Sequence, residues 1–333
     1  MVCLYIGATR SLNKYQFTEK KKDDNTELSN DNQLLSIKSA MSIPIIATIT
    51  LLTVYFAIKQ EFTIVSHLIT LYFSLVGALI MKKYLYEYFK ASPRLQAYDY
   101  PVEILQRMQY FRLNMTLLEL GCLAVSIYFE YLYIQSNFFI ANNVISICLA
   151  IYAIENWLVG NFRNIVLVFM GLIAYDVYFV FHSEVMMTVA KGINLPLKLL
   201  VPFDSQMKTF AMIGTGDIII PGLFCSMCLR CDLIQAFNKG RQNAIDEGVK
   251  DKTKLVPYID KEMGCFYFNT SLVGYFLGLL MTVAALVITQ QSQPALLYIL
   301  PSQIVVYMAA AFGRKEFLKM IKYDEDAELS QQK

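Results

Sequence analysis

Asn164–His182 reads NIVLVFMGLIAYDVYFVFH, an apolar run interrupted by a single carboxylate, Asp176. A helix needs about 20 mainly apolar residues to cross the hydrocarbon core of a bilayer, so this run predicts a membrane-spanning helix. A carboxylate inside such a helix costs about 2.5–3.5 kcal/mol on the insertion scale, and residues of this kind generally have a function. Asp176 is therefore the first candidate functional residue.

The whole chain shares this apolar character. Of its 333 residues, 56% are hydrophobic and 17% are charged, and the mean hydropathy is +0.43. Soluble domains average about 45–50% apolar and about 25% charged residues, so the composition predicts an all-α polytopic membrane protein whose environment is the lipid bilayer. A net charge of +2 without long basic runs excludes a nucleic-acid partner.

Eight segments are long and apolar enough to be full spans. They are Ile43–Ile58, Thr63–Met81, Met115–Ile134, Ile140–Val159, Asn164–His182, Thr209–Leu229, Cys265–Ile288 and Pro294–Phe312. Met1–Thr9 is also apolar but reaches less than half of the necessary length, so it is either a stub of a longer segment or an interfacial segment.

The distribution of Lys and Arg predicts the orientation, because cytoplasmic loops of membrane proteins collect these residues. Of the 29 basic residues, all but Lys59, Lys191, Lys198 and Lys208 lie in segments on the same side as the C-terminus. The C-terminus and the charged stretch Lys20–Asp31 are therefore expected to be cytosolic.

A second acid inside a predicted span, Asp217, ends the sequence Gly214-Thr215-Gly216-Asp217. With a rise of about 1.5 Å per helical residue, antiparallel spans place Asp176 and Asp217 about 9 and 12 Å below the same membrane face. Two carboxyl groups at one depth share a proton, so the ionised group can accept a proton from water while the protonated group polarises a carbonyl.

Pro221 has no N–H for the Asp217 carbonyl, and the helix is expected to be weakened there. A packing motif is the alternative interpretation of the two glycines.

The remaining polar residues of the spans are expected to be structural. Glu119, Glu130 and Glu155 lie near predicted span ends, where they can snorkel or form hydrogen bonds. The stretch Cys225–Cys231 has a CxxCxxC spacing but no convincing fourth ligand, so no metal site is predicted. No cofactor is expected.

Three signatures together resemble the signal peptide peptidase family, the presenilin-related intramembrane aspartyl proteases. They are Tyr175-Asp176 in one span, Gly214-Thr215-Gly216-Asp217 in the next, and Gln293-Pro294-Ala295-Leu296 at the start of the last span. The resemblance covers nearly the whole chain. It implies a bundle like that of presenilin and signal peptide peptidase, with eight full spans after the truncated first one.

The resemblance also implies roles for individual residues. Asp176 and Asp217 would be the catalytic pair, and Tyr175 would form a hydrogen bond at the site. Gly214 and Gly216 would shape the site. Thr215 replaces the leucine that is more frequent in the family and would alter substrate preference. Pro294, Ala295 and Leu296 would lie against the site and help to hold the substrate.

The implied organisation has four parts: a truncated first helix with a cytosolic charged segment (1–42), N-terminal spans (43–159), a catalytic core (160–312) and a cytosolic tail (313–333). The implied partners are membrane-embedded signal peptides and type II transmembrane segments, and a homo-oligomer is left open. The implied location is the endoplasmic reticulum membrane.

Two other functions compete with proteolysis. In a proton-coupled transporter or channel, Asp176 and Asp217 would relay protons, but no internal repeat supports this. A catalytically silent binder of membrane proteins in quality control is the other alternative, and the presence of both acids argues against it.

Overall fold

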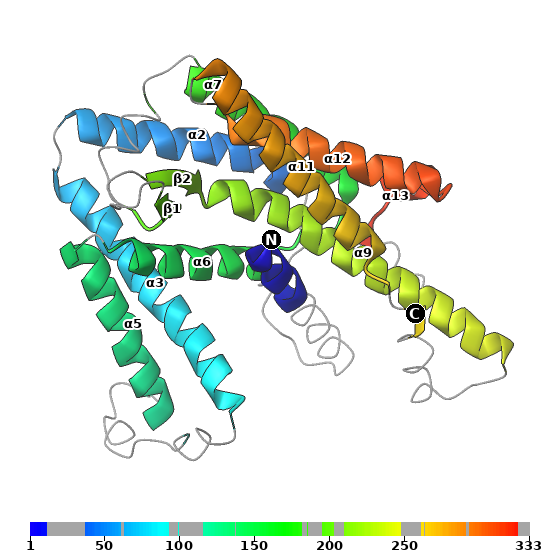
Figure 1. Ribbon diagram of the computed structural model, residues 1–333, viewed down its shortest axis with the longest axis horizontal. Coiled ribbons are helices and arrows are strands. Elements are labelled where there is room, and N and C mark those ends of the chain that lie inside the picture. Colours follow the sequence, from blue (N-terminus) through cyan, green and yellow to red (C-terminus); the bar gives the residue numbers. More distant parts are fainter. Residues whose placement is uncertain are drawn as a thin grey trace. The chain divides into compact units, whose positions relative to one another are not determined.

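The computed structural model describes most of the chain (Figure 1). The described residues are 1–11, 37–60, 63–92, 99, 116–136, 138–181, 185, 195–202, 210–247, 261–262, 264–290 and 293–325. The predicted cytosolic stretch Lys20–Asp31 lies outside them. The chain forms two compact units: the first comprises Met1–Phe56, Ala153–Val189 and Asp217–Lys333, and the second comprises Ala57–Tyr152 and Ala190–Gly216.

The first unit is helical. After a helix over residues 2–11, its elements are α2 (Ile37–Lys59), α7 (Phe162–Phe181), α9 (Gly216–Asp246), α11 (Phe266–Thr289), α12 (Ala295–Gly313) and α13 (Phe317–Ile321). Aromatic rings from α7, α9 and α12 form the centre of its core, where the Phe224 ring lies 5.9 Å from Phe169 and 5.1 Å from Tyr307. This contact holds three helices together through side chains that lipid cannot reach.

The second unit contains helices and the strands of one small sheet. Its elements are α3 (Thr63–Lys90), α5 (Leu117–Ser136), most of α6 (Phe139–Asn156), and the strands β1 (Lys198–Pro202) and β2 (Phe210–Gly214). The strands pair antiparallel in a register that joins Lys198 to Gly214 and Pro202 to Phe210. Within this unit α3 and α5 lie side by side (Figure 1).

Six helices of the described ranges are long and apolar enough to cross a membrane: His67–Lys90, Leu117–Ser136, Phe139–Asn156, Phe162–Phe181, Phe266–Thr289 and Ala295–Gly313. This confirms the predicted class, a helical multi-pass membrane protein, but the count of eight full spans is not reproduced. The predicted span Ile43–Ile58 lies in α2, whose apolar part, Ser42–Phe56, is shorter.

The predicted span Thr209–Leu229 is wrong in its first third. Phe210–Gly214 is strand β2, and α9 begins only at Gly216 and continues to Asp246. Hydropathy does not distinguish a short apolar strand from a stretch of helix, which explains the error. Asp217 therefore lies in the first turn of α9, and the predicted depth of about 12 Å, which assumed helical rise from Thr209, does not hold.

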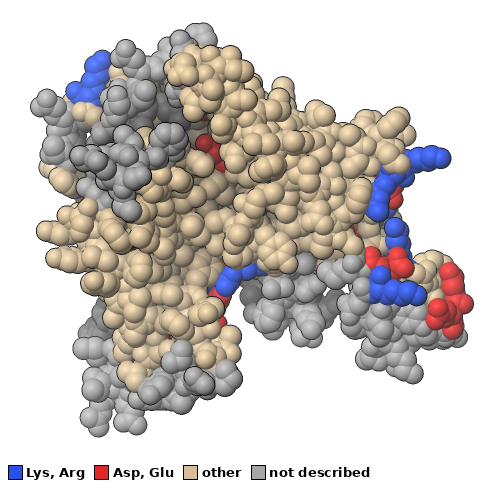
Figure 2. All heavy atoms as spheres, in the orientation of Figure 1, with Lys and Arg blue, Asp and Glu red and all other residues tan. Residues whose placement is uncertain are grey.

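The outer surface of the first unit is largely apolar. Side chains along α11 such as Phe276, Leu280 and Ile288 are exposed. Figure 2 shows the atoms over α11 and α12 in tan, with basic groups beyond the end of α12. Exposed apolar area of this extent is typical of a surface that faces lipid rather than water.

The three additional acids have structural partners, as expected. Their contacts are Glu119 with the Thr116 backbone N–H (3.3 Å), Glu130 with the Ser74 hydroxyl (2.7 Å) and Glu155 with the Arg10 guanidinium (3.8 Å). All three cysteines of Cys225–Cys231 are fully buried in α9. No cluster of three His, Cys, Asp or Glu side chains suited to a metal ion occurs in the described ranges.

Candidate active site

Two contacts define how α7 and α9 lie against each other. The Arg230 guanidinium donates a hydrogen bond to the Val159 carbonyl oxygen shortly before α7 (2.8 Å). Further along α7, the ring of Phe169 packs on that of Phe224. As the chain advances from Val159 to Phe169, its partners on α9 move back from Arg230 to Phe224. The two helices are therefore antiparallel.

The antiparallel arrangement places the two candidate acids toward the same end of the helix pair. Asp176 lies seven residues after Phe169, and Asp217 lies seven residues before Phe224. Seven residues correspond to about two helical turns, so each acid lies about 10.5 Å beyond the ring contact, on the same face of its helix as the ring. Because the helices are antiparallel, Asp176 and Asp217 both lie on the same side of the Phe169–Phe224 contact along the helix axes.

Asp176 lies near the start of α12. Its side chain is largely buried, with 7% of the residue exposed. The backbone N–H of Leu296 forms a hydrogen bond with the Asp176 carboxyl group. Leu296 is the second residue of α12, and N–H groups in the first turn of a helix have no partner within the helix. The Leu296 N–H is therefore available to a carboxylate.

The Pro294-Ala295-Leu296 sequence forms the start of α12, as the sequence predicted. Pro294 is the N-cap residue, with φ −68° and ψ 109°, and Ala295 is the first helical residue. The Leu296 side chain is buried in the core of the first unit. The motif thus orients the first turn of α12 by packing, while its backbone contacts Asp176.

Asp217 is at the N-terminal end of α9. A helix N-terminus carries a partial positive charge that stabilises a nearby carboxylate. On α11, Tyr275 is buried and interacts electrostatically with Asp217. Sequence reasoning missed Tyr275, because an aromatic residue in an apolar span has no local signal that distinguishes it from lipid-facing neighbours.

The residues immediately before Asp217 belong to the second unit. Gly214 is the last residue of β2, and Thr215 donates through both its backbone N–H and its hydroxyl to the Leu197 carbonyl oxygen, at 3.0 Å each. Thr215 therefore closes the end of the strand pair. A Cβ added at Gly216 would meet no described atom within 4 Å, so the described residues do not pack closely against this glycine.

Tyr175, the residue before Asp176 in the sequence, lines a cavity. The cavity has a volume of about 430 Å³ and is lined by Thr48, Leu52, Tyr175, Tyr178, Phe179 and Val185. The Tyr175 ring packs on Phe179 with a centroid distance of 4.9 Å. The hydrogen bond expected from Tyr175 to the site stays a prediction.

Two acids toward the same end of antiparallel helices in a multi-pass membrane protein suit one class, the intramembrane aspartic proteases. Comparison with known proteins agrees with this class. A model of the family described as signal peptide peptidase matches residues 27–327, so the chain belongs to the signal peptide peptidase family.

Individual relatives show the same similarity. The human protein named signal peptide peptidase is 29% identical over 311 residues, which cover 88% of this chain and 74% of the human one. A protein of Schizosaccharomyces pombe named a probable intramembrane protease is 27% identical over 325 residues, covering 98% and 92% of the two chains. The Caenorhabditis elegans protein named intramembrane protease 2 is 32% identical over 192 residues, covering 56% and 38%.

The family membership confirms the resemblance inferred from the three signatures. It supports an intramembrane protease and not the transporter alternative. The roles of the individual site residues stay predictions, and they are the basis of the following proposal.

Proposed function

We propose that this intramembrane protease hydrolyses peptide bonds with Asp176 and Asp217 as its catalytic pair. The antiparallel packing of α7 on α9 is the observation that carries the proposal, because it places both acids toward the same end of the two helices. All residues of the proposed site lie within the predicted catalytic core, residues 160–312.

In the proposed mechanism the pair holds one proton between its two carboxyl groups. The ionised carboxylate removes a proton from water, and the resulting hydroxide attacks the carbonyl carbon of the substrate. The protonated carboxyl group donates a hydrogen bond to the carbonyl oxygen. The carboxyl group that took a proton from water then passes it to the leaving nitrogen, the tetrahedral intermediate collapses, and the two peptide products separate.

The other site residues position the pair and the substrate in this proposal. The Leu296 N–H holds the Asp176 carboxyl group, and Pro294 with Ala295 keeps the first turn of α12 in place. Gly214, Thr215 and Gly216 lead from β2 directly to Asp217. Tyr175 lines the cavity described above, where an apolar substrate side chain would fit.

The proposed substrates are signal peptides and type II membrane segments that lie in the bilayer. The names of the relatives support this substrate class, and the distribution of Lys and Arg supports a cytosolic C-terminus. The proposed location is the endoplasmic reticulum membrane, as the resemblance to the family implies. Exposed apolar helices are compatible with surrounding lipid and with a homo-oligomer.

Cleavage of a membrane-embedded signal peptide by the purified protein in liposomes tests the catalytic pair. Asp176→Asn, Asp217→Asn and the double variant should each lower the rate at least about 1,000-fold and to a similar extent, because the two acids act as a unit. Glu130→Gln is the matched control, since it neutralises a buried membrane acid but still accepts the Ser74 hydrogen bond, and its rate should be unchanged. Substantial cleavage by either Asp variant would contradict the proposal.

A further inference from the structure

Gln303 is a fully buried amide in the middle of α12. Its Nε2 donates to the Pro221 carbonyl oxygen at 3.2 Å and lies 3.2 Å from the Cys225 sulfur, both on α9. The same nitrogen lies 3.4 Å from the Ser271 carbonyl oxygen on α11. A single amide therefore links α9, α11 and α12.

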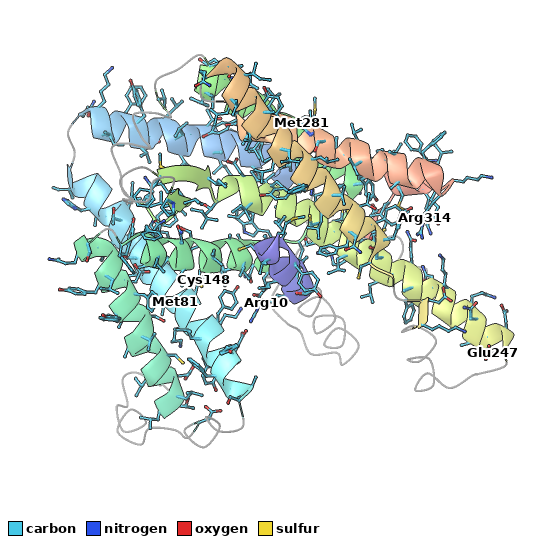
Figure 3. All side chains as sticks on the ribbon, viewed as in Figure 1. Arg10, Met81, Cys148, Glu247, Met281 and Arg314 are labelled. Atoms are coloured by element: carbon cyan, nitrogen blue, oxygen red, sulfur yellow. The ribbon has the colours of Figure 1, made fainter. Side chains whose placement is uncertain are left out.

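The helices α11 and α12 form a closely packed pair, and this packing restricts the position of the α12 backbone at Gln303. A Cβ added at Gly274 or Gly278 of α11 would lie 2.7 or 2.5 Å from a Cα atom of α12. The Ser302 hydroxyl donates a hydrogen bond to the Gly274 carbonyl oxygen. Figure 3 shows the pair, with Met281 labelled on α11.

The position of Asp217 depends on contacts from outside its own helix. Pro221 has no N–H, so the usual hydrogen bond from residue 221 to the Asp217 carbonyl cannot form. The first turn of α9, which carries the carboxyl group, is thus held less firmly to the rest of the helix. The Gln303 amide binds the carbonyl of Pro221 itself, one turn after Asp217.

The helix α12 therefore contacts the surroundings of both acids. At its start the Leu296 N–H binds the Asp176 carboxyl group, and seven residues later Gln303 binds the turn that follows Asp217. We propose that Gln303 is a positioning residue that sets the separation of the two catalytic carboxyl groups through Pro221. This inference rests on the proposed function of Asp176 and Asp217.

The first test is Gln303→Met, which keeps the length and approximate volume of the side chain but removes the amide. A displacement of about 1 Å at a catalytic group can cost about 100-fold in rate, so kcat for the membrane-embedded signal peptide should fall about 10- to 100-fold. KM should change less than about twofold, because the amide does not contact substrate. Ser302→Ala is the matched control: it removes a neighbouring hydrogen bond within the α11–α12 pair, and its kcat should be unchanged.

A double-mutant cycle separates positioning from packing. Pro221→Ala restores an N–H that can bind the Asp217 carbonyl and hold the first turn of α9 from within. In this background Gln303→Met should lower kcat less than about threefold. Equal effects of Gln303→Met with and without Pro221→Ala would overturn the proposal.

Further outcomes are equally decisive. A wild-type kcat for Gln303→Met would also overturn the proposal. So would a loss of kcat for Ser302→Ala equal to that for Gln303→Met. If Gln303→Met does not purify as a folded protein, Gln303→Asn tests the same contact, because its shorter side chain withdraws the amide from Pro221; an unchanged kcat would then refute the inference. Activity of Asp217→Asn would refute the proposed function instead, so the two failures are distinguishable.

Discussion

At the scale of single residues, Pro221 has the clearest connection to the chemistry. It is buried in the interior of α9, four residues after Asp217, and its carbonyl accepts the Gln303 amide. A proline in this place costs one hydrogen bond of the helix. A local defect that persists beside a functional group generally serves the function of that group.

Pro221→Ala should therefore lower kcat about 10-fold while the melting temperature in detergent stays the same or rises. The new N–H can bind the Asp217 carbonyl and make the first turn of α9 regular, at the expense of the geometry of the acid pair. The measurement is the rate of signal peptide cleavage together with thermal unfolding of each purified variant.

Pro301→Ala in α12 is the control, because Pro301 is also inside a helix but is exposed. Its activity should remain at the wild-type level. An unchanged rate for Pro221→Ala would show that Pro221 only packs. A lower melting temperature would show that the proline is needed for folding.

At the scale of elements, the strand pair is the feature that hydropathy did not reveal. Polar side chains of α6 hold β1 in place: Asn143 exchanges two hydrogen bonds with Leu200, each 2.8 Å long, and Asn142 donates to the Lys198 carbonyl oxygen at 2.6 Å. The Ser146 hydroxyl donates to the Pro196 carbonyl oxygen just before β1. The α6 side chains thus take the place of a third strand and satisfy the backbone groups of β1.

Asn143→Ala should open the strand pair locally without unfolding the protein. The change removes both hydrogen bonds to Leu200, each of which contributes about 0.5–1.5 kcal/mol. Hydrogen exchange at the Leu200 amide should accelerate about 10-fold or more, as measured by mass spectrometry. The amide of Met227, buried in α9, is the internal control. Unchanged exchange at Leu200 would show that pairing with β2 alone holds β1 in place, without the hydrogen bonds from α6.

At the scale of the whole molecule, a buried ion pair joins segments of the first unit that are far apart in the sequence. The Arg230 guanidinium contacts the Glu325 carboxylate at 3.1 and 3.2 Å and the Ser11 hydroxyl at 2.9 Å. Both Arg230 and Glu325 are completely buried. The contacts connect the N-terminal helix, the middle of α9 and the chain just after α13.

Glu325→Ala should lower stability strongly, by about 3–5 kcal/mol, because it leaves the Arg230 charge buried without its carboxylate. Thermal unfolding in detergent measures the loss. The double variant Arg230→Leu/Glu325→Leu should be more stable than Glu325→Ala, because it contains no unpaired charge. A melting temperature of Glu325→Ala equal to that of the wild type would contradict the role assigned to this pair.

The sequence by itself determined the class of the protein and its candidate acids. Hydropathy summed over about 20 residues is a local property, so the helices around Asp176 and after Cys265 were predicted to within a few residues. Short motifs are local as well, which is why Asp176, Asp217 and Pro294-Ala295-Leu296 could be selected without a structure.

Only the tertiary structure decided which of these residues meet. Gln303 and Tyr275 are inconspicuous in apolar spans, and Arg230 was assigned to a cytosolic loop, yet the fold buries all three. The strand Phe210–Gly214 forms because it pairs with Lys198–Pro202. The physical reason is the same in each case: burial, strand pairing and hydrogen bonding depend on partners distant in the sequence, and local hydropathy contains no information about those partners.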